Sequence, residues 1–457
     1  MVNLLLSALS GALLSCAFEP VGKWYLAPLA LAVHMYALNR TDKKALSILA
    51  FAVTFNALLL HWTSIYVGSM PWLILTFGLS ILYLPLMLIK RWGIAAYPLL
   101  FVIAEEIRNR FPFGGFDWGR VAYSQADAPF SKIAAYGGAI ALSAITALVA
   151  IFIFLLAQKH FRPLILLPLL LLMIPSSISE NVQTNVLMVQ GNVPQYGLDF
   201  NSRATQVFFN HARETDKALA VNENIDFILW PENAVDVDPF SNKTVSSELN
   251  KYDVPLLIGA IVDNNGATLN TSILWRKSGH ELYAKQHLTP FGEYIPLRSL
   301  ASKISPLVDQ VDDFSAGNQS KVFKIGKAKV APVICYELID DSILENAAKN
   351  SNILAVQTNS ATFGRSAESA QQLSISRVRA IEHSRNILSV STTGYSAVIN
   401  YKGEIVQKTS LGTAEHIVAN VGLIDSQSPR DRLGDWAGIF TLMWLLLVSR
   451  RAYVLRR

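Results

Sequence analysis

Long apolar runs separated by short polar loops fill the first 178 residues of the chain, and one further apolar run lies near its end. A helix that crosses a bilayer needs about 20 mostly apolar residues, with a range of roughly 17–25. The pattern therefore predicts a bundle of about eight membrane-spanning helices. They are expected at 3–18, 24–39, 45–67, 70–89, 93–109, 132–157, 162–178 and 434–449.

Basic residues in the loops indicate the orientation of these helices, because Lys and Arg gather on the cytoplasmic side of membrane proteins. With the N-terminus in the cytoplasm, the cytoplasmic segments are 39–44, 90–92, 158–162 and the tail 449–457, and all four are basic. An even number of spans then places both termini inside. The region between the seventh and the last span is expected outside the cytoplasm.

Between residues 180 and 430 the pattern changes to short, β-branched apolar runs that are apolar throughout, as in strands covered on both faces. Strands are expected within 184–193, 225–234, 254–262, 271–277, 329–337, 351–360, 386–400 and 416–423, and helices at 204–221, 340–350 and 366–385. This order predicts an α/β domain built as a layered sandwich. We divide the chain into three parts: residues 1–180 with the first seven membrane-spanning helices, the α/β domain at 181–432, and the last helix with its basic tail at 433–457.

Composition agrees with a membrane protein that carries one globular domain. The 457 residues are 51% hydrophobic and 16% charged, whereas soluble domains are roughly 25% charged. The mean hydropathy is +0.32. The net charge of +5 comes from basic residues beside apolar runs, with no basic stripe interleaved with aromatics, so we expect no nucleic-acid partner.

Cysteine and histidine usage narrows the chemistry further. Cys16 and Cys335 are the two cysteines, and Cys16 lies in an apolar run, so we expect no disulfide framework. The histidines of the α/β domain have no zinc-binding spacing, and we predict no metal and no cofactor. The chain also has no nucleophile elbow of the G-x-S-x-G type.

Polar residues cluster where the predicted strands end. The clusters are Pro231–Glu232–Asn233, Cys335–Tyr336–Glu337 and Thr358–Asn359–Ser360, and a loop bearing Lys285 and Glu293 lies between the first two. Ligands of α/β proteins bind beyond the carboxyl ends of the strands, so these side chains are candidates for one site.

A cysteine nucleophile needs a base to take its proton and positive charge where an oxyanion develops. Glu232 supplies the base, Lys285 the cation and Cys335 the nucleophile, while Glu293 and Glu337 hold the lysine and the base in position. Taken singly, Cys335 has a simpler interpretation as a residue of the hydrophobic core, because free cysteine is among the most buried residue types. The joint occurrence of these residues at strand ends favours the catalytic one.

The loop 105–127 carries charged and aromatic residues at one end of the predicted bundle. It fits either an aromatic belt at the membrane interface or a loop that grips a lipid head group or acyl chain. Glu105 and Arg108 have the i, i+3 spacing of a helical pair.

Three segments of the α/β domain resemble the Glu, Lys and Cys motifs of the nitrilase, or carbon–nitrogen hydrolase, superfamily. They read WPENA (230–234), KQHLTPFGEYIP (285–296) and VICYE (333–337). With the flanking apolar helices, the resemblance narrows to the bacterial apolipoprotein N-acyltransferases. Further similar stretches at 113–127, 188–195 and 357–399 extend it over nearly the whole chain.

The resemblance implies an αββα sandwich on an eight-helix bundle, in a multi-pass protein of the cytoplasmic (inner) membrane with its catalytic domain on the extracytoplasmic face. The family's base matches Glu232, its lysine Lys285 and its nucleophile Cys335. Supporting residues match Glu293, Tyr336 and Glu337, and substrate-binding candidates are Trp230, Asn359, Phe363, Phe116 and Trp118. Cys335 would take an acyl chain from a phospholipid as a thioester and pass it to the α-amine of a diacylglyceryl lipoprotein.

Two stretches depart from the family pattern. Many members have Asn-Asp-Ala-Trp-Phe-Gly where this chain has Thr362 in place of the tryptophan, and the usual Phe-Pro-Trp has Asp117 in place of the proline. The first departure removes an aromatic side chain beside the site.

Two other functions are alternatives to acyl transfer. A membrane-tethered amidase or nitrilase would use the same triad with water as the acceptor, but it has no need of so many spans. A transporter or receptor would be expected to carry charge within its spans, and segments 45–89 and 132–178 carry almost none.

Overall fold

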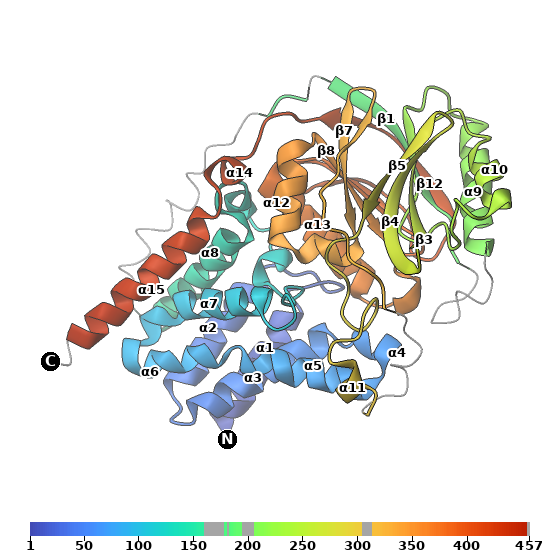
Figure 1. Cartoon of the computed structure of the whole chain (residues 1–457). Helices are drawn as coiled ribbons and strands as arrows, with labels where there is room; N and C mark the ends of the chain where they lie inside the picture. Colours follow the sequence, from blue (N-terminus) through green and yellow to red (C-terminus); the bar gives the residue numbers. More distant parts are fainter. Residues whose placement is uncertain (160–177, 181, 194–204, 304–312, 455–457) are drawn as a thin grey trace. The chain divides into compact units, whose positions relative to one another are not determined.

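The computed structural model describes residues 1–159, 178–180, 182–193, 205–303 and 313–454 (Figure 1). The chain forms two compact units. The helical unit comprises Met1–Ser176 and Ser428–Arg457, and the sandwich unit comprises Ser177–Gln427.

The helical unit contains ten α-helices among the described residues. They are α1 (Val2–Ser15), α2 (Leu26–Asn39), α3 (Lys44–Leu59), α4 (Thr63–Val67), α5 (Ser69–Ile81), α6 (Ile89–Trp92), α7 (Tyr97–Arg110), α8 (Ala134–Ala157), α14 (Pro429–Leu433) and α15 (Trp436–Val454). The expected single helix over 45–67 was wrong, because α3 ends at Leu59. The hydroxyl of Thr63 donates to the Leu60 carbonyl at 2.8 Å, and such side-chain bonds compete with the helical ladder.

Two helical stretches among the described residues are long and apolar enough to cross a membrane, Ser69–Trp92 and Ser131–Ala157. Shorter apolar helices are Val2–Ser15, Leu26–Asn39, Lys44–Leu59 and Trp436–Leu447. Residues 162–177 of the seventh expected span lie outside the described residues.

The sandwich unit contains two sheets, each of six strands in the part of the chain described. The first has the order β12-β1-β2-β3-β4-β5, and the second β11-β10-β9-β8-β7-β6. The first sheet comprises β1 (Val182–Gln190), β2 (Phe227–Leu229), β3 (Leu256–Asn264), β4 (Ala267–Arg276), β5 (Gly279–Ala284) and β12 (Glu415–Leu423). The second comprises β6 (Phe323–Ile325), β7 (Ala328–Ile334), β8 (Ile353–Thr358), β9 (Ile387–Ser391), β10 (Ala397–Ile399) and β11 (Ile405–Lys408).

Both faces of these sheets are covered, as the apolar strand sequences predict. In β1, Val186 and Met188 join the core between the two sheets, whereas Leu187 and Val189 join a second core against helix α9 (Gln206–Leu219). This alternation follows from the period of two in a strand. Helix α10 (Lys243–Leu249) also covers the first sheet, and α12 (Asp341–Asn350) and α13 (Glu368–His383) pack on the second (Figure 1). The expected α/β sandwich with helices on its outer faces is confirmed.

The sequence pattern missed the weakest strands. The run 386–400 contains two antiparallel strands, β9 and β10, rather than one. Strand β11 lies at a sheet edge with four exposed residues, so it lacks the alternation that marks a half-buried strand.

Candidate active site

Cys335 lies directly after β7 and begins a short 3-10 helix, Cys335–Ile339. Its φ of +49° is in the left-handed region, which costs a residue with a side chain on the order of 1–3 kcal/mol. The turn is held from two directions. The Ile334 N–H donates to Glu337 Oε2 at 2.8 Å, and Arg379 Nε from helix α13 donates to the Leu338 carbonyl at 3.0 Å. Cys335 as a whole residue is partly exposed.

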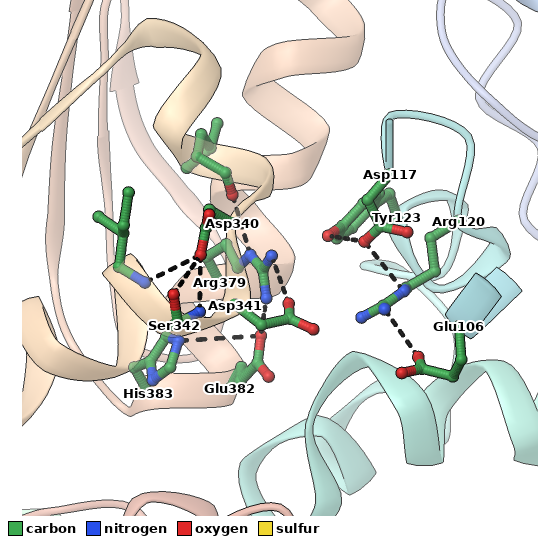
Figure 2. A network of polar contacts seen from close by, with 12 residues as sticks. Glu106, Asp117, Arg120, Tyr123, Asp340, Asp341, Ser342, Arg379, Glu382 and His383 are labelled. Carbon is green, nitrogen blue, oxygen red and sulfur yellow. Dashed lines mark hydrogen bonds and ion pairs between the residues drawn. The ribbon is translucent and has the colours of Figure 1, made fainter. Parts of the chain in front are cut away.

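Arg379 is itself fixed by carboxylates. It pairs with Asp341 at 2.7 Å and with Glu382 at 2.6 Å, and Figure 2 shows these contacts around the guanidinium. The neighbouring Asp340 caps α12 by accepting from the Ser342 and Ile343 N–H groups, and it also pairs with His287 at 2.8 Å. The nucleophile turn is therefore anchored to both helices that cover its sheet.

Lys285 lies between two carboxylates at the end of β5. Its Nζ is 2.7 Å from Glu293 Oε2 and 3.6 Å from Glu232 Oε1, and its side chain is 1% exposed. Asn270 of β4 donates to both glutamates, at 2.8 Å to Glu232 and 2.6 Å to Glu293. The structure thus brings the predicted base, lysine and supporting glutamate into one buried cluster.

The nucleophile joins this cluster electrostatically, because the Glu232 carboxylate and the Lys285 ammonium both act on the Cys335 thiol. Burial and the Glu232 charge raise the pKa of the thiol well above its ordinary value, and the Lys285 ammonium opposes the rise. Burial raises the pKa of Glu232 as well, and Lys285 again opposes the rise. The Cys335 thiol therefore keeps its proton at rest, and Glu232, whose charge acts on the thiol, is the candidate base that takes the proton during attack.

The other two charges of the cluster respond differently to burial. Burial alone would lower the pKa of Lys285, but the Glu293 and Glu232 carboxylates raise it above its ordinary value, so it stays a cation. Burial would raise the pKa of Glu293, but the Lys285 charge and hydrogen bonds lower it below its ordinary value. A fixed ion pair of Lys285 and Glu293 thus adjoins the base.

Glu337 links the nucleophile turn to the lysine loop. It is fully buried, and its Oε1 accepts from the Tyr283 hydroxyl and the Gln286 N–H, each at 2.6 Å, while Oε2 accepts from the Ile334 N–H. Burial raises the pKa of Glu337, and the Tyr283 and Ile334 hydrogen bonds limit the rise. One carboxyl group therefore sets the spacing between the ends of β5 and β7.

Gly259 of β3 lets the backbone that carries the base approach closely. A Cβ at this position would lie 2.3 Å from the Pro231 carbonyl oxygen and 2.5 Å from the Glu232 Cα. Real Cβ atoms essentially never come this near, so a side chain here would displace Glu232.

The predicted substrate-binding residues of the sandwich unit differ in their placement. Trp230 is fully buried, and its indole N–H donates to Thr215 of α9 at 3.0 Å, so its side chain belongs to the outer core and cannot reach a substrate in this conformation. Asn359 is partly exposed after β8 and accepts from the Thr392 hydroxyl at 2.8 Å. Phe363 ends the short helix Ala361–Phe363 that follows, which also contains Thr362. Tyr336 packs edge-on against the His287 ring.

The candidates Phe116 and Trp118 lie in the helical unit. The Phe116 carbonyl accepts from Arg108 Nε at 2.9 Å, and the Trp118 ring lies 5.0 Å from that of Trp62. Between them, the buried Asp117 accepts from the Tyr123 hydroxyl at 2.9 Å and pairs with Arg120 at 3.0 Å (Figure 2). The aspartate that departs from the family pattern is thus one half of a buried ion pair.

Sequence reasoning missed three polar side chains near the nucleophile: Asn270, Gln372 and Glu368. Gln372 Nε2 lies 3.8 Å from Cys335 Sγ, and Asn270 joins the two glutamates. Gln372 and Glu368 lie within the predicted helix 366–385, and Asn270 directly precedes the predicted strand 271–277. None lies at the carboxyl end of a predicted strand, so position along the chain gave no signal. Among the residues described, no group of three His, Cys, Asp or Glu side chains has the arrangement of a metal site.

Comparison with known proteins adds the family. The model of the apolipoprotein N-acyltransferase N-terminal domain matches residues 10–152, and that of the carbon-nitrogen hydrolases matches 173–430. An apolipoprotein N-acyltransferase of Mycolicibacterium smegmatis is 31% identical, over 94% of this chain and 81% of the relative. The chain belongs to the apolipoprotein N-acyltransferase family. The resemblance stated from the motifs and the predicted acyltransferase class are both confirmed.

Other members of the apolipoprotein N-acyltransferase family align over similar lengths. That of Geobacter metallireducens is 29% identical, over 95% of this chain and 92% of the relative. Among solved structures, Nit3 of Saccharomyces cerevisiae, a member of branch 10 of the nitrilase superfamily, is 18% identical over 54% of this chain and 93% of that chain, with a TM-score of 0.40.

Proposed function

We propose that this enzyme acylates the α-amine of the N-terminal diacylglyceryl-cysteine of apolipoproteins, the last step of lipoprotein maturation, with a phospholipid as acyl donor. The reaction would be ping-pong, through a thioester on Cys335. The observation that carries the proposal is the gathering of a strained, partly exposed cysteine, the Glu232 carboxylate that acts on its thiol and the buried Lys285, in a member of this family. Glu232, Lys285 and Cys335 are then the catalytic residues.

In the first half-reaction, the Cys335 sulfur attacks the ester carbonyl carbon of the phospholipid as Glu232 takes the thiol proton. The Lys285 ammonium, next to both groups, stabilises the negative charge that develops. The carbon–oxygen ester bond then breaks, Glu232 returns its proton to the leaving oxygen, and a lysophospholipid departs. The acyl chain remains on sulfur as a thioester.

In the second half-reaction, the acceptor's amine nitrogen attacks the thioester carbonyl carbon. Glu232 takes a proton from nitrogen and delivers it to the departing sulfur, so the amide forms and the thiol is regenerated. Glu293 keeps Lys285 charged, and Glu337 keeps the lysine loop and the nucleophile turn in register. No step requires a cofactor.

We further propose that the helical unit spans the inner membrane with about eight helices and that the domain 181–432 faces the extracytoplasmic side. Two long apolar stretches, four shorter apolar helices and the basic loops support this arrangement. Phe116 and Trp118 are proposed lipid contacts of the helical unit. Asn359, Phe363 and Tyr336 are proposed contacts of substrates in the sandwich unit.

The test is intact-mass measurement of the full-length enzyme after incubation with phospholipid vesicles. We expect a gain of one acyl group that hydroxylamine removes and that Cys335→Ala abolishes. Cys16→Ala is the matched control, because it removes the other cysteine and should acylate normally. A soluble amide hydrolysed without any mass gain from phospholipid would favour a membrane-tethered carbon–nitrogen hydrolase instead. Normal acylation of Cys335→Ala would refute the mechanism.

A further inference from the structure

Glu368 is a buried carboxyl group that the mechanism above does not use. It lies in the first turn of α13, with its side chain 2% exposed. The Ser360 hydroxyl donates to the carboxyl group, but Oε2 has no hydrogen-bond partner among the described residues. Burying a polar oxygen without a partner costs free energy, and the cost is larger if the oxygen is charged. A ligand that brings an N–H donor would offset this cost.

Glu368 lies on the side of α13 that is close to the sulfur of Cys335. Glu368 and Gln372 are four residues apart on α13 and so share one face of the helix. Gln372 Nε2 lies 3.8 Å from Cys335 Sγ. Glu368 is also close enough to the nucleophile and the base that its charge acts on the Cys335 thiol and the Glu232 charge acts on it.

The acceptor has the complementary chemistry. An α-amino group has a pKa of about 7.7–8.0, so near neutral pH much of it arrives as an ammonium with three N–H donors. Only the neutral amine can attack the thioester. One proton must therefore leave the nitrogen before attack, in addition to the proton that Glu232 takes during it.

We propose that Glu368 binds the primary ammonium group of the acceptor beside the thioester and removes its first proton. The inference rests on the proposed function. As the ammonium binds, the carboxyl group releases its own proton to solvent and pairs with the ammonium as a carboxylate. The carboxylate then accepts one proton from the ammonium, leaving a neutral amine and a neutral carboxylic acid. The amine then attacks as described, and Glu368 releases its proton to solvent after the amide has left.

The electrostatics of the site support this role. Burial raises the pKa of Glu368 to about 8, with the Ser360 hydrogen bond lowering it and the Glu232 carboxylate raising it. This value matches that of an α-amine, so the proton passes between them at little cost in free energy. The other ionisable groups of the neighbouring cluster are Cys335 and the paired Lys285 and Glu293.

A phospholipid can bring the same chemistry, because ethanolamine head groups also end in a primary ammonium. In that lipid, however, glycerol and phosphate separate the ammonium from the scissile ester. The acceptor's nitrogen instead must reach the carbonyl carbon attached to Cys335 Sγ. A carboxyl group on the helix face that contacts the sulfur therefore fits the acceptor better.

The test measures the two half-reactions of full-length Glu368→Gln separately. Acyl-enzyme should form from phosphatidylethanolamine and from phosphatidylglycerol within about twofold of the wild-type rates. Transfer from the acyl-enzyme to a synthetic diacylglyceryl-cysteine peptide should fall about 100-fold at pH 6.5 and recover to within a few-fold at pH 9, where the amine is neutral. Glu214→Gln, which alters another buried glutamate, should leave both half-reactions unchanged.

Each other outcome overturns the inference. A loss of transfer that is equal at every pH would mean a structural role, and slower acylation from phosphatidylethanolamine alone would mean that Glu368 binds the head group. If Glu368→Gln does not fold, Ser360→Ala serves instead: losing that hydrogen bond should shift the pH profile of transfer upward, and an unchanged profile would count against the proposal. A wild-type enzyme that forms no acyl-enzyme would overturn the proposed function itself.

Discussion

Replacing Glu337 by glutamine should slow acyl-enzyme formation strongly, although Glu337 does not touch the thiol. The carboxyl group accepts hydrogen bonds from Tyr283, Gln286 and Ile334, and these donors lie on the two segments that carry Lys285 and Cys335. Glutamine keeps one acceptor oxygen. Its NH2 group must replace the other carboxylate oxygen, where this donor would face an N–H or O–H donor and could not accept its hydrogen bond.

The size of the effect follows from these contacts. Losing a hydrogen bond to a charged group costs about 1.5–3 kcal/mol, and leaving a buried donor unsatisfied costs about 1–3 kcal/mol. A total of about 3–4 kcal/mol, expressed in the acylation transition state, slows the reaction by 10²–10³-fold. Tyr283→Phe removes one donor and leaves the carboxylate, so it should cost about tenfold.

The assay is the rate of acyl-enzyme formation by intact mass, with thermal melting of each variant as the control for folding. A double-mutant cycle over Glu337→Gln and Tyr283→Phe should show strong non-additivity, because both changes disturb the same contact. Acylation of Glu337→Gln at the wild-type rate would refute the reasoning. So would a Tyr283→Phe variant slower than Glu337→Gln.

Three further predictions concern the same cluster. Gly259→Ala should cost about 1–3 kcal/mol of stability and lower acylation at least tenfold, because its Cβ would displace Glu232; melting and intact mass check it, and an unaffected rate would contradict it. Lys285→Met leaves the buried Glu232 and Glu293 carboxylates without their cation, so it should destabilise the fold by about 3–5 kcal/mol at pH 7.5, with a smaller deficit at pH 5 as carboxylates take up protons; melting curves at both pH values decide. Glu368 has a raised folded-state pKa, so the folded state binds its proton more tightly than the unfolded state, and stability falls as pH rises from about 4.5 to about 8. The free energy of unfolding of Glu368→Gln should therefore equal that of the wild type at pH 4.5 and exceed it by up to about 5 kcal/mol at pH 8.5. Melting curves at both pH values check this, and a difference that does not change with pH would contradict the assignment.

The site concentrates carboxyl groups around a cysteine. Glu232, Glu293 and Glu368 act electrostatically on the thiol and raise its pKa, and the Lys285 ammonium opposes them. This arrangement disfavours a free thiolate in the resting enzyme. It suits a reaction in which the proton leaves sulfur only as the carbonyl is attacked, because the charges of both the base and the cation act on the thiol.

Much of this protein could be predicted from its sequence. Apolar length marks the helical segments, and the apolar strand runs of the α/β domain mark a sheet covered on both faces, because each burial pattern has its own period along the chain. Glu232, Lys285 and Cys335 could be named as candidates for one site because ligands of α/β proteins bind beyond the carboxyl ends of strands. The structure shows that these ends belong to two sheets, since β2 and β5 lie in the first and β7 in the second. Trp230 was named as a substrate-binding candidate beside them, although its side chain points into the outer core, because adjacent residues of an extended segment face opposite sides.

Only the tertiary structure decided which side chains complete the site. Asn270, Gln372 and Glu368 lie inside strands or helices, and their role depends on which face meets the neighbouring sheet edge, a fact that no local pattern records. The positive φ of Cys335 and the close approach at Gly259 likewise arise from how β2, β3 and β7 are paired and covered. The sequence by itself determined the elements and the chemistry at their ends, because periodicity and residue type are local. That Glu368 Oε2 is buried without a hydrogen-bond partner among the described residues is a property of the folded chain alone, because burial depends on packing.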